Sequence, residues 1–121
     1  MKKKRILVVD DHALTRELIA NMLREADYEV ELATDGEEAI TLLSSYRPDL
    51  ILTDFAMPRL NGINVLLHVR HTSPATPVII FTSDITPEVE QKARQLGVRD
   101  YIQKPFDIDD LLRRITRALT A

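Results

Sequence analysis

Charged and hydroxyl side chains follow four of the apolar segments in this chain of 121 residues. Asp10 and Asp11 come directly after the segment ILVV, and Asp54 comes directly after LILT. Thr82 follows VIIF, and Lys104 follows YIQ. These five side chains are the first candidates for a chemical site.

Three carboxylates that converge would repel one another. Two such charges in contact cost about 4 kcal/mol at an effective dielectric constant of 20. A hard divalent cation removes that repulsion, and oxygen-only ligands favour Mg²⁺, which keeps coordination positions for water and phosphate oxygens. Lys104 adds a positive charge and Thr82 a hydroxyl donor, so the set suits a phosphoryl group. Because a carboxylate is ordinarily ionised at neutral pH, Asp54 could act as the nucleophile without a general base.

The segments that must position these side chains alternate between strand-length apolar runs and helical periodicities. The expected strands are Ile6–Val9, Val30–Ala33, Leu50–Leu52, Val78–Phe81 and Tyr101–Ile102. Apolar residues also recur at helical spacing, and we expect them to form the core. They are Leu14, Leu18 and Met22, flanked by Ile19 and Leu23; Ala39, Ile40 and Leu43; Ile63, Leu66, Leu67 and Val69; Val89, Ala93 and Leu96; and Ile108, Leu111, Leu112, Ile115 and Leu119. Strict alternation predicts an α/β fold with a parallel sheet and helices on both faces. In such a sheet the ligand site lies beyond the carboxyl ends of the strands, where the five candidate side chains would converge.

Local signals mark where several of these helices begin and end. Asp35 with Glu38 predicts a capping box before the second helix. Thr86, followed by a proline, predicts the N-cap of the fourth helix. Gly97 is expected where that helix ends in a left-handed conformation, and Gly62 is interpreted as a turn glycine.

Composition narrows the class of protein. With 45% hydrophobic residues, the chain can form one domain over residues 1–121. It has no cysteine, which excludes disulfides and thiolate metal sites. It lacks an apolar run of the roughly 20 residues that a membrane helix needs, and its start, MKKKR, lacks the apolar stretch of a secretory signal. We therefore expect a soluble cytoplasmic protein without membrane contact. A net charge of −3 with interspersed acids and bases argues against direct nucleic-acid binding.

The motifs around the candidate residues resemble those of the receiver domains of two-component response regulators. VVDDH matches the acidic pair, LTDFAMPRLNG the phospho-acceptor strand and its loop, FTS the hydroxyl strand, and YIQKPF the lysine–proline turn. The motifs occur in the order and spacing of that family and cover essentially the whole chain. The resemblance implies a flavodoxin-like, doubly wound sheet of five parallel strands in the order 2-1-3-4-5, an order that a chemotaxis receiver exemplifies.

The resemblance also implies a role for each site residue. Asp54 would accept a phosphoryl group from a sensor histidine kinase or a histidine phosphotransfer protein. Mg²⁺ would bind directly to Asp11, Asp54 and the backbone carbonyl of Ala56, while Asp10 would act mainly through water. Lys104 would pair with the phosphoryl group. The domain would catalyse only its own phosphorylation and dephosphorylation, so no enzyme with an external substrate is expected.

A conformational switch is implied as well. Thr82 would move toward the phosphoryl group, and Tyr101 would change its rotamer with it. The face formed by the fourth helix, the fifth strand and the fifth helix would then bind a partner or a second copy of the chain. The peptide bond between Lys104 and Pro105 would be cis, in a tight turn that aims the lysine into the site.

Three positions depart from the pattern of many family members. Ala56, two residues after the acceptor, and Asp84, two residues after Thr82, border the path of the hydrolytic water, so both are expected to tune the lifetime of the phosphate. Arg99 precedes Asp100 where many DNA-binding members carry another acid, which weakens any transfer of their dimer salt bridges to this chain.

Two alternatives remain open from the sequence. The first is a degenerate receiver that serves as an interaction module without phosphorylation, although such a domain would be expected to lose part of the acidic set or the lysine. The second is a small phosphatase of the haloacid dehalogenase type, which also uses an aspartate nucleophile and Mg²⁺. That class needs a second acid two residues after the nucleophile, and this chain has Ala56 there.

Overall fold

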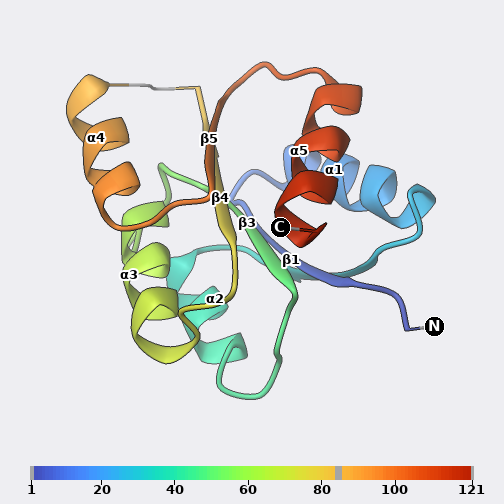
Figure 1. The fold of residues 1–121 in the computed structure, drawn as a ribbon, viewed down its shortest axis with the longest axis horizontal. Helices are drawn as coiled ribbons and strands as arrows, with labels where there is room; N and C mark the ends of the chain where they lie inside the picture. The colour runs from blue at the N-terminus through green and yellow to red at the C-terminus, as the bar shows by residue number, and fades with distance from the viewer. Residues whose placement is uncertain (1, 84–85, 121) are drawn as a thin grey trace.

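The strands form one parallel sheet, shown in the computed structural model of Figure 1. The structure describes residues 2–83 and 86–120. The strands are β1 (Arg5–Val9), β2 (Glu29–Ala33), β3 (Leu50–Asp54), β4 (Val78–Thr82) and β5 (Asp100–Gln103). Their spatial order is β2-β1-β3-β4-β5, and each neighbouring pair is parallel. The predicted doubly wound sheet of order 2-1-3-4-5 is therefore confirmed.

Helices cover both faces of the sheet. They are α1 (Ala13–Glu25), α2 (Gly36–Leu42), α3 (Gly62–Thr72), α4 (Pro87–Gln95) and α5 (Ile108–Thr120). In Figure 1, α1 and α5 lie on one side of the sheet, and α2, α3 and α4 lie on the other. Within the described part of the chain, none of the helices combines the length and the apolarity needed to cross a bilayer.

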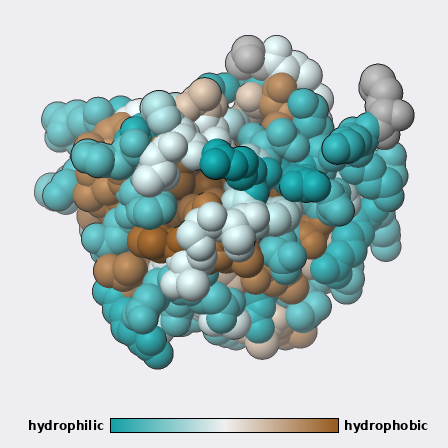
Figure 2. Space-filling view, turned by 90° about the horizontal axis from the view of Figure 1, so that it is seen from below, coloured by the Kyte–Doolittle hydropathy of each residue, from teal (hydrophilic) through white to brown (hydrophobic). Residues whose placement is uncertain are grey.

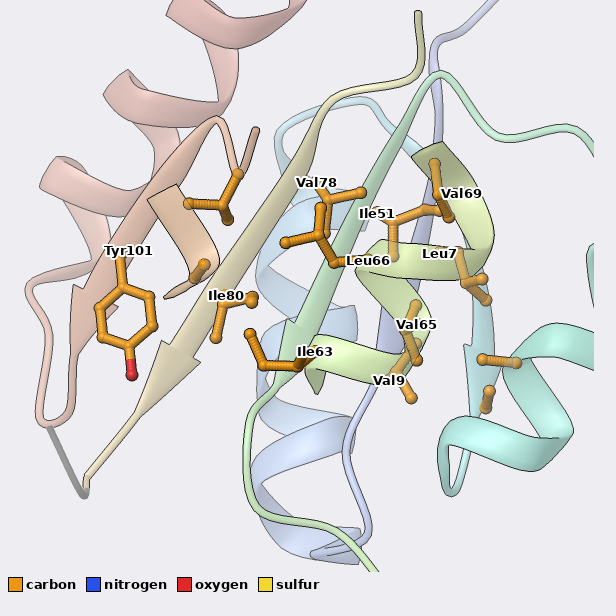
Figure 3. Close-up of a cluster of buried hydrophobic side chains, with 14 residues drawn as sticks. Leu7, Val9, Ile51, Ile63, Val65, Leu66, Val69, Val78, Ile80 and Tyr101 are labelled. Atoms are coloured by element: carbon orange, nitrogen blue, oxygen red, sulfur yellow. The ribbon is translucent and has the colours of Figure 1, made fainter. Parts of the chain in front are cut away.

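Each face of the sheet buries its own apolar cluster, because successive side chains of a strand point to opposite faces. On one face, Leu7 and Ile51 share a cluster with Leu66 of α3 (Figure 3). On the other, Leu52 shares a cluster with Ile115 of α5. Burial of each such side chain stabilises the fold by about 1.5–3 kcal/mol. The central strands β1, β3 and β4 thereby form a rigid base for the groups at their carboxyl ends.

The predicted core stripe of α1 is wrong at Leu14 and Leu18, and the flanking residues Ile19 and Leu23 form the core in their place. Leu14 and Leu18 are exposed, at 75% and 58% of their surface, whereas Ile19 and Leu23 are buried. A helix turns about 100° per residue, so a stripe through Ile19 and Leu23 faces a different direction from one through Leu18. The sequence contains both stripes, and packing against the sheet selects the second. Leu67 of α3 is also exposed, at 40%, beside the buried Leu66.

The helix caps agree in part with the sequence signals. Thr86 Oγ1 accepts a hydrogen bond from the backbone N–H of Val89 at 3.3 Å, as predicted. Asp35 likewise accepts one from the N–H of Glu38 at 2.8 Å. However, the Glu38 carboxylate accepts from the N–H of Thr34 at 2.9 Å, one residue before the predicted donor. The second half of the predicted capping box is therefore displaced onto Thr34.

Gly97 and Gly62, the two glycines that the sequence analysis singled out, are required for different reasons. Gly97 has a φ of 87°, the left-handed helix end that was predicted. Gly62 is instead the buried first residue of α3, so its interpretation as a turn glycine is wrong. A Cβ atom at Gly62 would lie 2.7 Å from the carbonyl oxygen of Asp54. Glycine is needed there because α3 begins against the backbone of β3.

Candidate phosphoryl-transfer site

The ends of β1 and β3 bring three carboxylates together. Asp10 follows β1 directly, Asp11 is the next residue, and Asp54 is the last residue of β3, the strand beside β1. One carboxylate oxygen from each residue lies within 4.8 Å of the other two. Asp10 and Asp54 are buried, whereas Asp11 is exposed. The structure thus places these three predicted residues in one cluster that solvent reaches from the side of Asp11.

Lys104 reaches the same cluster from the far side of the site. It follows β5, and its backbone N–H donates to the carbonyl of Thr82 at 2.8 Å. Its Nζ atom lies 3.5 Å from Oδ2 of Asp10 and 3.5 Å from Oδ2 of Asp54. The peptide bond between this lysine and the proline after it is cis. One ammonium group therefore bridges the two buried carboxylates.

The carboxyl group of Asp54 has an altered acidity. Its pKa is raised from 3.8 to about 6, chiefly because burial removes water from the charged form. The ammonium of Lys104 lowers this pKa, and the neighbouring charge of Asp10 raises it. At neutral pH the ionised form still predominates, but the fold destabilises it. A further positive charge at the cluster would relieve that cost.

The residues present fit a hard divalent cation. Oδ1 of Asp10 accepts a hydrogen bond from the backbone N–H of His12 at 2.9 Å. Oδ2 of Asp10 is buried and has no hydrogen-bond partner in the described part of the chain. A buried carboxylate oxygen is costly unless a cation faces it, and Lys104 at 3.5 Å meets this need only in part. Three carboxylates suit Mg²⁺, as the sequence suggested, and the carbonyl of Ala56 remains a predicted further ligand.

The predicted switch residues lie on β4, the strand beside β3, and on β5, the strand beside β4. Thr82 ends β4 and is buried. Tyr101 pairs in register with Ile80 and lies inside the cluster that includes α3 residues, with 6% of its surface exposed (Figure 3). Burial raises the pKa of Tyr101, and the charge of Glu90 adds to the effect. The tyrosine ring is therefore already turned inward. Asp84, a predicted lifetime-tuning residue, lies outside the described residues.

Sequence reasoning missed two features next to the site. The Nζ atom of Lys104 lies over the ring of Phe81, 4.6 Å from its centroid. Leu18, Met22 and Phe106 line an apolar groove that extends to Lys104. Neither feature has a signal in a local sequence pattern, since each combines residues from distant segments.

Comparison with known protein families identifies the class of this domain. The family model of the response regulator receiver domain matches residues 6–116. This chain belongs to that family. The match extends from the second residue of β1 into α5, so it includes the four other strands in full and every candidate site residue. A receiver domain is a phosphoryl-accepting signalling module of a two-component system, and neither the phosphatase nor the degenerate module finds support in the comparisons.

Individual relatives agree with the family match. The response regulator MprA of Mycolicibacterium vanbaalenii is 41% identical over 115 residues, which are 95% of this chain and 49% of MprA. The chain therefore spans about half the length of this curated relative. Chemotaxis protein CheY4 of Vibrio cholerae is 33% identical, with a TM-score of 0.91 over 97% of this chain and 99% of its own. Response regulator TrrA of Thermotoga maritima, solved in complex with Mg²⁺ and BeF, is 31% identical, with a TM-score of 0.87 over 95% of this chain and 98% of its own.

Proposed function

We propose that Asp54 is the phospho-acceptor and that residues 1–121 act as one receiver domain. The phosphoryl group would come from a sensor histidine kinase or a histidine phosphotransfer protein. One observation carries the proposal: the Asp54 carboxylate lies within 4.8 Å of those of Asp10 and Asp11, and Lys104 Nζ is 3.5 Å from its Oδ2. The complex of TrrA with Mg²⁺ and BeF supports the same chemistry in a relative of known structure.

In the proposed reaction, a carboxylate oxygen of Asp54 attacks the phosphorus atom in line with the phosphorus–nitrogen bond of the donor phosphohistidine. The new phosphorus–oxygen bond forms as the phosphorus–nitrogen bond breaks, and the electron pair leaves on the donor imidazole. Charge is spread over three equatorial oxygens in the transition state. Lys104 would pair with one of these oxygens, and the Thr82 hydroxyl would donate to another. Mg²⁺, when bound by the aspartates and the Ala56 carbonyl, supplies charge neutralisation.

The first test is the site itself. Asparagine is a poor nucleophile and a poor metal ligand, so Asp54→Asn should abolish formation of the acyl phosphate. Both proteins are incubated with Mg²⁺ and acetyl phosphate, and incorporation is measured by intact mass. Asp27→Asn is the matched control, because the side chain of Asp27 is exposed and pairs only with Lys3 among the described residues. Equal incorporation into the Asp54 variant would contradict the assignment.

A docking surface for the phosphodonor lies beside the proposed acceptor. Leu14 and Leu18 are exposed on α1, and the apolar groove next to them is lined by Leu18, Met22 and Phe106 and ends at Lys104. An exposed apolar patch at the mouth of a reactive site is typical of a protein-binding surface. The donor protein would cover this groove with an apolar helix face and so place its phosphohistidine over Asp54.

Output would follow from the Thr82–Tyr101 pair. The phosphoryl group can shift an equilibrium only through contacts that differ between two states. Thr82 is the last residue of β4, and a movement of its hydroxyl toward the phosphoryl group would change the space beside the Tyr101 ring. Because the ring is already inward, phosphorylation would stabilise this arrangement over one in which the ring turns out.

The responding surface would be the face of α4, β5 and α5, either toward a partner or in a homodimer. Lys92 and Arg99 are exposed on it. Arg114 is bound within the chain, at 2.8 Å from Asp100 and 2.9 Å from Asp110. A partner with acidic groups would therefore meet Lys92 and Arg99 first, while the Arg114 ion pairs would have to reorganise before they could bridge two copies.

The lifetime of the phosphate on Asp54 would depend on the residues near the hydrolytic water. Ala56 offers no polar side chain to position the hydrolytic water, and Asp84 is the second residue expected to act on it. We expect slow hydrolysis, so Ala56→Asn should lose the phosphoryl label faster than the parent; slower loss would contradict this view.

The domain would turn over no external substrate, and it would act in the cytoplasm, where kinases that use ATP supply the donor.

A further inference from the structure

The ring of Phe81 lies directly beneath the ammonium group of the site. Lys104 Nζ is 4.6 Å from the ring centroid, inside the range of about 6 Å within which a cation is attracted to an aromatic face. The ring of Phe106 meets that of Phe81 at a centroid distance of 6.0 Å and an angle of 84°, an edge-to-face pair. Phe81 is fully buried, so the ring is fixed in place.

The backbone places Phe81 next to the acceptor. It pairs in register with Asp54 across β3 and β4, and its carbonyl accepts a hydrogen bond from the N–H of Phe55 at 3.2 Å. Its side chain lies in the cluster on the face covered by α1 and α5, against which Phe106 also packs. The same ammonium group lies 3.5 Å from Asp10 and 3.5 Å from Asp54, so it contacts both carboxylates and the ring at once.

Phe81 is itself a core residue, in the same buried cluster as Ile79 of β4. The neighbouring residues Ile79 and Ile80 fill equally buried positions on the same strand with aliphatic side chains. Lysine is a long side chain with several rotatable bonds, and holding its head in one place costs conformational entropy. An aromatic face offsets part of that cost, because it attracts the cation without neutralising it.

We propose that Phe81 is a positioning residue for phosphoryl transfer: its ring, supported by Phe106, seats the ammonium of Lys104 between Asp10 and Asp54. The inference rests on the proposed role of Asp54. The rate of phosphorylation then depends on the electron density of the Phe81 ring, and it does so only when Lys104 is present.

The first measurement tests the geometry without any phosphorylation. In the full chain, the ε-methylene protons of Lys104 should show an upfield ring-current shift by NMR. Phe81→Leu should remove that shift, while Ile79→Val, a conservative change in the same strand and the same core cluster, should leave it. A Lys104 methylene at its ordinary chemical shift in the parent would overturn the proposal, even if Asp54 is phosphorylated normally.

The second measurement tests the mechanism. Phe81 is replaced site-specifically by 4-fluoro-, 3,5-difluoro- and 3,4,5-trifluorophenylalanine, which keep the ring shape and progressively weaken its negative face. The rate constant for phosphorylation by acetyl phosphate with Mg²⁺ should fall stepwise, by about three- to tenfold in total, as expected for loss of a cation–π contact. Urea unfolding of each variant shows that the fold is kept.

A double-mutant cycle separates positioning from packing. In a Lys104→Met background the same fluorinated series should give equal rates, because the cation is gone. The proposal would be overturned if the rate constant did not change across the fluorinated series in the parent, or if it still fell across the series in the Lys104→Met background. If Asp54→Asn is phosphorylated as well as the parent, the proposed function fails instead, and the ring-current measurement still decides whether Phe81 seats the lysine.

Discussion

Asp54→Asn should make the free domain more stable at neutral pH, although it removes the proposed phospho-acceptor. Only 7% of the surface of Asp54 is exposed, and its carboxylate lies in the same cluster as that of Asp10. The fold raises the pKa of Asp54 to about 6 from an ordinary value of 3.8. The folded protein therefore holds a destabilised charge at neutral pH, and an uncharged amide of nearly the same shape would remove it.

The magnitude and its pH dependence follow from that shift. The values of about 6 and 3.8 differ by roughly two pKa units, which corresponds to about 3 kcal/mol at 1.36 kcal/mol per unit. A group whose pKa is raised by folding contributes stability below its unfolded pKa, and this contribution is lost as the pH rises through the folded pKa. The parent should thus lose stability between about pH 4 and pH 6, while the asparagine variant should not. Above pH 7 the variant should be more stable by about 2–3 kcal/mol.

Urea unfolding of both proteins in EDTA, at several pH values between 4 and 8, measures this difference. Asp27→Asn is the control, because Asp27 lies on the surface at a φ of 73°, which asparagine tolerates. Saturating Mg²⁺ should reduce or reverse the higher stability of the Asp54→Asn variant, since the ion stabilises the carboxylate cluster of the parent and not that of the variant. A variant no more stable than the parent at pH 7.5, or equally more stable at pH 4 and pH 7.5, would refute the reasoning.

Four further changes test other parts of the structure. Mg²⁺ at 100 times its Kd should stabilise the parent by about 2.7 kcal/mol in thermal or urea unfolding; Asp11→Ala should lose most of this gain, and an unchanged response would argue against the metal site. Tyr101→Ala should keep phosphorylation but uncouple it from association, as measured by sedimentation with and without beryllofluoride; a response like that of the parent would exclude the Thr82–Tyr101 route. Leu18→Ser should slow transfer from a phosphorylated donor protein about tenfold, or 1.4 kcal/mol, without slowing acetyl phosphate; equal losses with both donors would remove α1 from the docking surface. Gly62→Ala should cost about 1–3 kcal/mol in urea unfolding, because its Cβ would lie 2.7 Å from the Asp54 carbonyl oxygen; a neutral result would show that α3 shifts freely.

The sequence pattern was sufficient for the fold class and for the residues that gather at the site, whereas the strand order came from the resemblance to receiver domains. Apolar segments that end on Asp10, Asp54 and Lys104 are strands of a parallel sheet, and the carboxyl ends of such strands meet at one edge. The local sequence pattern therefore predicted which distant residues meet. In a parallel sheet, a residue at the carboxyl end of one strand lies near the residues at the carboxyl ends of the neighbouring strands. The cap at Thr86 and the left-handed glycine at Gly97 were predicted for a similar reason, since each depends on a few consecutive residues.

Only the tertiary structure decided which of several compatible arrangements the side chains adopt. Leu18 and Ile19 both fit a helical stripe, and contact with the sheet alone determines that Ile19 is buried. The need for glycine at Gly62 comes from the backbone of β3, and the aromatic ring that contacts Lys104 Nζ belongs to Phe81 of β4. Such contacts join different helices, strands and loops, so no local periodicity encodes them. Close packing of those segments is what fixes them, because a buried atom has room in only one of the arrangements that its own sequence permits.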